Sequence, residues 1–300
     1  MKVVLAGASG FLGRALAESL IGDGHRVITL VRRPRRSPAE FEWHPERGEL
    51  DPAALAGTDA VIGLSGAGIA AKRWTAEYKR ELLDSRVQPT ATLATTLAGL
   101  PAERRPGVFL NASAIGFYGE RGDQPLPEGA AKGSGFLADL VVQWEGATAP
   151  AVEAGVRVAT LRTGLVLAAS DGLLKRLIPL YRVGLGGKLG SGQQWQSWIS
   201  LADEIGAIRH ALVTDSISGP VNLAGPEPVR NDEFSRALGE VLHRPAIFPT
   251  PAFGIRLVLG QFADEGALAS QRVLPQVLTD TGYSFEHTDV RTALRWALTH

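Results

Sequence analysis

Cysteine is absent from the 300 residues of this sequence. A chain without thiols cannot form disulfides, use a thiolate nucleophile, or bind zinc or iron–sulfur clusters through sulfur. Six histidines are present, but none stands near carboxylates at metal-ligand spacing, and no Ser-His-Asp set lies on a nucleophile elbow. We therefore expect neither a metal site nor serine-hydrolase chemistry.

An excess of charge of either sign is also absent. Lys plus Arg and Asp plus Glu number 31 each, so the formal net charge is zero. Without a long-range positive field, we expect no binding to nucleic acid or to an anionic membrane surface. No apolar run reaches the roughly 18 residues of a membrane span, and the first run, 3–6, is too short for a signal-peptide core. We expect a cytoplasmic protein whose partner, if it has one, is a small-molecule substrate.

What the first half of the sequence does contain is an alternation of short apolar runs and longer helical patterns. The apolar runs predict strands that are buried on both faces. Such strands alternating with helices are typical of a parallel sheet with crossover helices. We expect an α/β fold with a Rossmann-type, doubly wound parallel sheet in residues 1–168. The predicted strands are 2–6, 26–31, 60–64, 108–112 and 156–161, and the predicted helices are 11–21, 75–97 and 135–154.

After residue 168 the pattern changes to helices separated by glycine-rich or proline-rich loops. No flexible linker separates the halves, so we expect a smaller, mostly helical substrate lobe at 169–300 that packs against the first domain. Apolar positions at helical spacing near the C-terminus predict helices packed in a core. The predicted helices are 173–181, 202–213, 231–242, 253–262 and 290–298.

A glycine-rich segment follows the first predicted strand directly and opens the first predicted helix. Its pattern is G-x-x-G-x-x-G. Gly7 suits a tight turn, Gly10 allows a pyrophosphate to approach the backbone, and Gly13 lets the helix lie close to the sheet. The helix N-terminus also offers free N–H groups to phosphates. We expect a bound dinucleotide, with contacts from Gly7, Ser9, Gly10, Phe11, Leu12 and Gly13.

Two arginines end the second predicted strand, where an NAD-binding domain usually has an acidic residue for the ribose 2′-hydroxyl. A guanidinium group stays charged and can bind a phosphate through two hydrogen bonds. Arg32, with Arg33 as the second candidate, therefore favours NADP(H) over NAD. The alternative is a solvated basic turn, since Arg35 and Arg36 follow.

These motifs resemble the extended short-chain dehydrogenase/reductase superfamily, which includes nucleotide-sugar epimerases and dehydratases. Segments 59–67, 111–114 and 198–203 are similar to its fourth-strand segment, its active-site serine strand and a segment of its substrate lobe. More narrowly, the chain resembles an atypical branch, the "epimerase family" proteins of uncharacterised function, which end in a short C-terminal module, here about 249–297. The narrower resemblance rests on 72–75, 85–87, 113–119, 136–138, 144–145, 184–187, 190–192 and 270–275.

The resemblance implies further cofactor contacts that the residue pattern alone does not select. Arg86 has an argument of its own, because it is a charge beside an otherwise apolar helical face, although a solvated helix surface explains it equally well. The contacts that the resemblance implies are Arg32, Leu64, Ser65, Gly66, Glu81, Arg86 and Val166.

The Tyr-x-x-x-Lys pair of ordinary superfamily members is missing. In those enzymes the lysine lowers the pKa of the tyrosine, so that its phenol can exchange a proton with the substrate. None of the four tyrosines here has a lysine four residues later, and the segment where the pair is expected, 135–142, is largely apolar. An unperturbed phenol has a pKa of about 10, so the usual mechanism does not carry over.

Ser113 and Tyr118 are the remaining candidate catalytic residues. Ser113 could orient a carbonyl at the edge of the sheet, or cap the strand end. Tyr118 is the best remaining phenol, although a tyrosine near this place helps to shape the pocket in ordinary members. Lys132 could lower the pKa of a phenol, or be solvated.

A glycine-rich segment, 184–198, contains Trp195 and Trp198. Its composition predicts a loop over a ligand, with the two indoles as candidate substrate contacts. The alternative is a surface loop pinned by tryptophan.

Two functions remain open at this point. The first is an NADP-dependent oxidoreductase or epimerase that acts on an unknown carbonyl or sugar-like substrate. The second is a non-catalytic NADP-binding redox sensor or scaffold, which accounts directly for the missing Tyr-Lys pair.

Overall fold

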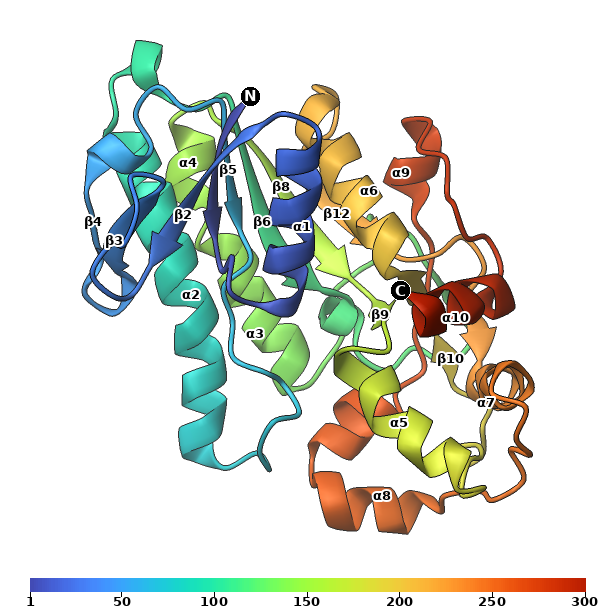
Figure 1. The fold of residues 1–300 in the computed structure, drawn as a ribbon. Coiled ribbons are helices and arrows are strands. Elements are labelled where there is room, and N and C mark those ends of the chain that lie inside the picture. The colour runs from blue at the N-terminus through green and yellow to red at the C-terminus, as the bar shows by residue number, and fades with distance from the viewer.

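One sheet of eight strands forms the centre of the computed structural model, which describes all residues from 1 to 300 (Figure 1). The strand order is β12-β8-β6-β5-β1-β2-β3-β4, and all neighbours are parallel except β3 and β4. The predicted Rossmann-type sheet is confirmed. The strands are β1 (Lys2–Ala6), β2 (Arg26–Val31), β3 (Glu40–His44), β4 (Glu49–Leu50), β5 (Ala60–Gly63), β6 (Val108–Ala114), β8 (Arg157–Thr163) and β12 (Gly219–Leu223).

Helices cover both faces of this sheet. Val3 and Leu5 of β1 pack into the core of one face, and Val4 and Ala6 into the core of the other. Because successive side chains of a strand point to opposite faces, a strand covered on both sides reads as a continuous apolar run. The first face carries α1 (Phe11–Gly22) and α6 (Leu201–Val213), and the second carries α2 (Ala76–Gly99), α3 (Phe136–Gly146) and α4 (Ala149–Glu153).

Local sequence explains where these helices begin and end. Helix α2 begins after Thr75, whose hydroxyl accepts a hydrogen bond from the backbone N–H of Tyr78 at 3.1 Å. The single helix predicted at 135–154 is instead divided into α3 and α4. Pro150 lies in the first turn of α4, where its missing N–H costs nothing, whereas it could not continue α3.

The C-terminal lobe is mostly helical and has its own core, in which Trp198, Phe234 and Leu294 are fully or almost fully buried. However, α6 and β12, which follow the boundary predicted at residue 168, belong to the sheet and its core. The smaller elements are β7 (Pro125–Leu126), β9 (Leu165–Leu167), α5 (Gly172–Arg182), β10 (Trp195–Gln196), β11 (Trp198–Ser200), β13 (Val229–Arg230), α7 (Asn231–Val241), α8 (Ala252–Leu259), β14 (Arg272–Val273), α9 (Gln276–Asp280) and α10 (Val290–Thr299).

Helix α8 differs from its predicted packing. Phe253, Leu257 and Val258 are 74%, 71% and 72% exposed, and only Ile255 of this helix is buried. The helical spacing of the apolar residues was therefore not a sign of core packing here. No helix in the structure combines the length and the apolar content that crossing a membrane requires.

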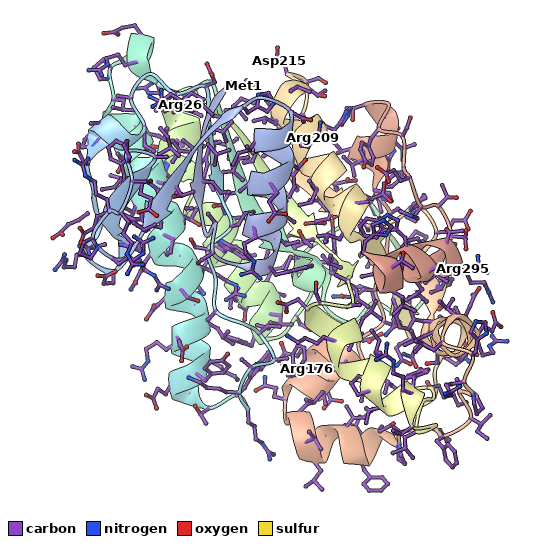
Figure 2. The ribbon with its side chains drawn as sticks, viewed as in Figure 1. Met1, Arg26, Arg176, Arg209, Asp215 and Arg295 are labelled. Atoms are coloured by element: carbon purple, nitrogen blue, oxygen red, sulfur yellow. The ribbon has the colours of Figure 1, made fainter.

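The carboxyl ends of the parallel strands point toward the C-terminal lobe. In Figure 1, β1 runs from the N label down toward the half of the view that holds α5 and α8. Figure 2 shows Met1, Arg26 and Asp215 at the opposite edge, and Arg176 of α5 on the lobe side. Arg176 donates a hydrogen bond to the carbonyl of Ala70, in the loop after β5, at 3.1 Å. Ligands of open α/β sheets bind at this carboxyl edge.

Candidate cofactor site and active site

The turn from β1 into α1 is built on contacts that only glycine allows. Gly7 has a φ of +85°, and a Cβ there would lie 2.7 Å from the carbonyl carbon of Leu64. A Cβ on Gly13 would lie 2.2 Å from the carbonyl oxygen of Gly7, so α1 can pack this closely only because Gly13 has no side chain. Both glycines therefore hold the end of β1 against the end of β5 and the start of α1.

Gly10 has a different surrounding. It is the exposed N-cap of α1, and the only atom near a Cβ at this position is the Gly7 carbonyl oxygen, at 3.2 Å. No side chain caps the helix, and no acidic residue stands in its first turn. The first N–H groups of α1 are therefore available to an anion. Ser9 is exposed, and Phe11 and Leu12 are half-buried beside this opening.

The two arginines after β2 lie in different surroundings. Arg33 binds Glu40 of β3 through two hydrogen bonds, of 2.9 and 2.7 Å. The guanidinium of Arg33 lowers the pKa of Glu40 to about 2. Strand β3, which the sequence pattern did not predict, pairs with β2 and brings Glu40 to this position. Arg33 is therefore engaged within the protein, whereas Arg32 is exposed and remains the candidate for a 2′-phosphate.

The loop after β5, which contains Leu64, Ser65 and Gly66, is held in place by a side chain of α2. Arg86 donates hydrogen bonds to the carbonyls of Ala67 (2.9 Å) and Leu82 (3.1 Å). A Cβ on Gly66 would lie 3.2 Å from the guanidinium carbon of Arg86. Burial lowers the pKa of Arg86 to about 10, so this side chain keeps its charge near neutral pH. In this structure Arg86 positions the loop that faces Gly7.

Glu81 and Val166, which only the resemblance implied, lie in different places. Glu81 is exposed on α2 and pairs with Lys72 at 3.2 Å. Val166 is half-buried in β9, just beyond the carboxyl end of β8, and is paired with Ile199 of β11. Val166 therefore lies near the edge where a ligand is expected, while Glu81 lies on a solvated helix surface.

Ser113 faces the interior of the protein. Only 4% of it is exposed, and its hydroxyl donates a hydrogen bond of 2.6 Å to Glu145 of α3. Glu145 in turn forms an ion pair with Arg162 of β8 at 2.8 Å. The catalytic role of Ser113 stays a prediction, and in this structure its hydroxyl is held by the Glu145 carboxylate.

Tyr118 is also enclosed. It is fully buried, its hydroxyl donates to Asn222 at 2.7 Å, and Arg162 donates to that hydroxyl at 3.1 Å. Burial raises the pKa of Tyr118 above its ordinary value, the opposite of what an acid–base phenol needs. Lys132 does not lower it, since Lys132 pairs with Asp139 near the surface. The catalytic role of Tyr118 stays a prediction, which its burial and its raised pKa disfavour.

The two tryptophans of the predicted ligand loop lie in different surroundings. Trp198 is fully buried in the core of the C-terminal lobe, and its indole N–H donates to the carbonyl of Glu227 at 2.9 Å. Its role as a substrate contact stays a prediction, which this burial disfavours. Trp195 is half-buried in β10, and Arg230 and Arg272 lie over its ring.

The start of α3 is apolar, as the sequence indicated. Phe136 packs edge-on against Trp74 with 5.1 Å between ring centroids, and Phe262 lies 5.5 Å from the same indole. These rings join the first domain to the C-terminal lobe. No group of three or more His, Asp or Glu residues could hold a metal ion.

Sequence reasoning missed several polar residues near this edge. Glu145 and Arg162 form a buried ion pair, and Glu204 of α6 is fully buried with its Oε2 unpartnered. Burial raises the pKa of Glu204 to about 8, against the effect of a hydrogen bond from Thr163. A charged residue directly after an apolar strand was the available signal for Arg162, while Glu204 stands in an ordinary amphipathic pattern.

A separate hollow of about 290 Å³ lies between α1 and α6. Asp23, His25, Arg209 and Tyr283 are among its lining residues. Asp23 and His25 follow the C-terminus of α1, so the hollow lies at the opposite end of that helix from Gly10. It is therefore distinct from the carboxyl edge.

Comparisons with known proteins agree with this geometry. Residues 3–224 match the NAD dependent epimerase/dehydratase family, and residues 250–297 match a domain of unknown function. An epimerase family protein of Mycobacterium bovis is 44% identical, over 99% of this chain and 97% of that protein. The structure of the human epimerase family protein SDR39U1 with NADPH superposes with a TM-score of 0.90 at 29% identity, over 100% of this chain and 99% of that one.

A nucleoside-diphosphate sugar epimerase from Corynebacterium glutamicum is 35% identical and has a TM-score of 0.81. The match covers 99% of this chain and 58% of that one. The family match covers well over half of the chain. The chain therefore belongs to the NAD dependent epimerase/dehydratase family.

Proposed function

We propose that this protein is an NADPH-dependent oxidoreductase that binds its cofactor along the carboxyl edge of the sheet. The observation that carries the proposal is the turn at Gly7–Gly13. At Gly7 and Gly13 a side chain would clash with neighbouring backbone, whereas the space beside Gly10 is free for a ligand. The human relative SDR39U1, solved with NADPH, supports the choice of cofactor. NADPH, when bound, supplies a hydride.

Each part of the site would hold a different part of the cofactor. The free N–H groups at the start of α1 suit the pyrophosphate. The exposed guanidinium of Arg32 suits the 2′-phosphate, because Arg33 is already bound to Glu40. Leu64–Gly66, held by Arg86, provides the backbone opposite Gly7.

The protein's own contribution to the reaction is binding and orientation. Ser113 and Tyr118 are enclosed by Glu145, Arg162 and Asn222, so they do not move a proton to a substrate. The apolar start of α3 adds no acid or base. We propose a carbonyl reduction in which the proton comes from water or from the substrate itself.

A second candidate is a non-catalytic NADPH sensor. The enclosure of Ser113 and Tyr118 favours it, since a binding protein needs no proton donor. Both candidates require the same cofactor site, and they differ only in turnover.

The test is to follow NADPH oxidation by its absorbance with a panel of aldehydes, ketones and 2-oxo acids. The matched control is Gly10→Val, in which a branched side chain would block the opening at the start of α1. Turnover by the wild type that is lost in the variant supports the oxidoreductase. Tight binding without turnover of any compound supports the sensor, and absence of binding contradicts both.

A further inference from the structure

Exposed apolar side chains concentrate on one part of the C-terminal lobe. Thirteen large apolar side chains of the chain are exposed, and eight of them lie in residues 180–185 and 247–258. Five of the eight, among them Phe253 and Leu257, are 70% or more exposed. Apolar side chains that gather in one exposed patch mark a surface that binds another molecule or a membrane.

Backbone hydrogen bonds join these two segments. The N–H of Phe248 donates to the carbonyl of Gly186 at 3.0 Å, and the N–H of Thr250 donates to the carbonyl of Lys188 at 2.8 Å. Helix α8 follows this pairing directly. In Figure 1, α5 and α8 lie at the end of the molecule away from the N label. The exposed apolar side chains therefore belong to one surface.

Helix α8 turns its apolar side outward. Phe253 and Leu257 are four residues apart, so they lie on one side of the helix, and Val258 follows them. All three are exposed, whereas Ile255, on the other side of the helix, is buried. The helix is therefore held to the lobe by few apolar contacts and presents most of its apolar side chains to the surroundings.

The charge of this surface has one sign. Residues 172–190 and 243–262, which we call the α5–α8 surface, contain six Lys or Arg residues and no Asp or Glu, and all six are exposed. The zero net charge of the whole chain, on which the expectation of no membrane binding rests, therefore does not describe this surface. The six are Lys175, Arg176, Arg182, Lys188, Arg244 and Arg256.

The carboxylates that follow α8 do not neutralise the α5–α8 surface. Asp264 pairs with Arg256 at 2.9 Å, and this is the only ion pair that any of the six basic residues forms. Glu265 accepts hydrogen bonds from the backbone N–H of Leu137 at 2.9 Å and from the side-chain amide of Gln261 at 2.6 Å. Five of the six positive charges therefore have no carboxylate partner within the protein.

The chemistry of the α5–α8 surface separates the partners that could cover it. In a two-fold dimer the same surface of each copy faces its equal, so six basic residues would meet six others of the same charge. A protein partner would need a fitted pocket for each protruding apolar side chain. The headgroup region of an anionic bilayer takes up protruding apolar side chains without such pockets, and it attracts Lys and Arg. A lipid surface therefore fits best.

We propose that the α5–α8 surface docks on an anionic lipid bilayer. Phe253, Leu257 and Val258 enter the headgroup region, and the basic residues of the same surface bind lipid phosphates. The protein lies on the bilayer, and no helix crosses it. This inference goes beyond the proposed function, because docking requires neither the cofactor nor turnover.

The test is flotation of the full chain with two kinds of vesicle, at low and at high salt. One kind is phosphatidylcholine alone, and the other is an equimolar mixture of phosphatidylcholine and phosphatidylglycerol. We expect wild type to float with the mixed vesicles at low salt, and much less with the neutral vesicles or at high salt, because salt screens the attraction.

Two double variants separate the apolar contribution from that of charge. Phe253→Asn with Leu257→Asn should bind the mixed vesicles about tenfold or more weakly than wild type, because it removes the inserted side chains. Lys175→Gln with Arg182→Gln should also bind them about tenfold or more weakly. The side chains of Lys175 and Arg182 form no ion pair within the protein, so their loss should not disturb the fold.

The matched controls change residues of the same kinds elsewhere on the protein. Ile21→Asn with Val213→Asn replaces exposed apolar side chains of α1 and α6. Arg26→Gln with Arg104→Gln removes exposed charges, and Figure 2 shows Arg26 at the opposite edge of the molecule from α8. Both controls should bind the mixed vesicles within about threefold of wild type. Thermal denaturation checks that every variant folds.

Failure of wild type to float with the mixed vesicles overturns the proposal, and so does equal flotation of wild type and the two α5–α8 variants. Equally strong flotation with the neutral vesicles overturns the assignment to an anionic bilayer. Sedimentation velocity without vesicles tests the second copy as occupant. A dimer that Phe253→Asn with Leu257→Asn dissociates would assign the surface to that copy and overturn the proposal.

Discussion

The guanidinium of Arg162 binds the carboxylate of Glu145 through two hydrogen bonds, Nε to Oε1 and Nη2 to Oε2, each 2.8 Å long. Ser113 donates to the same carboxylate, and Tyr118 accepts from the same guanidinium. The serine and the tyrosine that the sequence offers for catalysis are therefore partners of a buried ion pair between β8 and α3. In this structure both side chains thus have partners within the protein.

Replacement of Glu145 by Gln should destabilise the protein by about 3 kcal/mol, because it leaves the Arg162 charge buried without its partner. The measurement is urea denaturation followed by circular dichroism. The matched control is Glu81→Gln, which breaks an exposed ion pair with Lys72 and should cost about 0 to 1 kcal/mol. Equal losses in the two variants would contradict a structural role for Glu145.

Replacement of Tyr118 by Phe should lower stability by about 1 to 2 kcal/mol, because Asn222 and Arg162 each lose a hydrogen-bond partner. NADPH affinity should stay within about threefold of wild type, and so should any turnover, since the phenol does not reach a substrate. Steady-state kinetics alongside denaturation separates the two effects. A loss of turnover of about a hundredfold or more at unchanged stability would restore Tyr118 as an acid–base residue.

Features that depend on local chemistry could be predicted from the sequence. The strand, glycine turn and helix around Gly7–Gly13 follow each other in the chain, and their pattern alone indicates the close contacts that the structure shows. The sheet class followed from apolar runs that need cover on both faces. The absence of the Tyr-x-x-x-Lys pair could also be seen in the sequence, because both residues would lie within one helix.

Features that depend on which strands become neighbours could not be predicted. Arg32 and Arg33 are equivalent candidates in the sequence. Only the pairing of β3 with β2 shows that Arg33 forms hydrogen bonds with Glu40. Trp195 and Trp198 are three residues apart, yet Trp195 lies beside two arginines and Trp198 lies in the core of the C-terminal lobe. Their surroundings come from segments more than 25 residues away in the sequence.

Replacement by Ala should affect stability more at Gly13 than at Gly10. Gly13→Ala places a Cβ 2.2 Å from the Gly7 carbonyl oxygen, so α1 must shift away from the sheet. We expect a loss of about 2 kcal/mol or more in stability together with weaker NADPH binding. Gly10→Ala meets only the Gly7 carbonyl oxygen at 3.2 Å and should keep its stability within about 1 kcal/mol.

Thermal denaturation with and without NADPH measures both variants. If Gly13→Ala were as stable as Gly10→Ala, the close packing of α1 on β1 would be disproved.

Glu204 should make stability depend on pH. Its pKa is about 8 in the folded protein against an ordinary value of 4.5, because it is buried with only Thr163 as a donor. Between these values the unfolded chain loses the proton and the folded chain keeps it. The wild type therefore loses stability as the pH rises from about 4.5 to about 8.

Glu204→Gln has no such proton. Between pH 5 and pH 8, the free energy of unfolding of Glu204→Gln should therefore rise relative to that of wild type by on the order of 3 kcal/mol. Urea denaturation of both proteins at several pH values measures the difference. A difference that stays constant with pH would mean that Glu204 is ionised in the folded protein.

The measurement that tests the account most directly is calorimetric titration of wild type, Arg32→Ala and Arg35→Ala with NADPH and with NADH. Arg35 is an exposed neighbour of Arg32 and serves as the control. We expect wild type and Arg35→Ala to prefer NADPH, and Arg32→Ala to lose about tenfold or more of its NADPH affinity with NADH affinity unchanged. An unaltered NADPH-to-NADH ratio in Arg32→Ala, or no binding of either nucleotide to the wild type, would contradict the account.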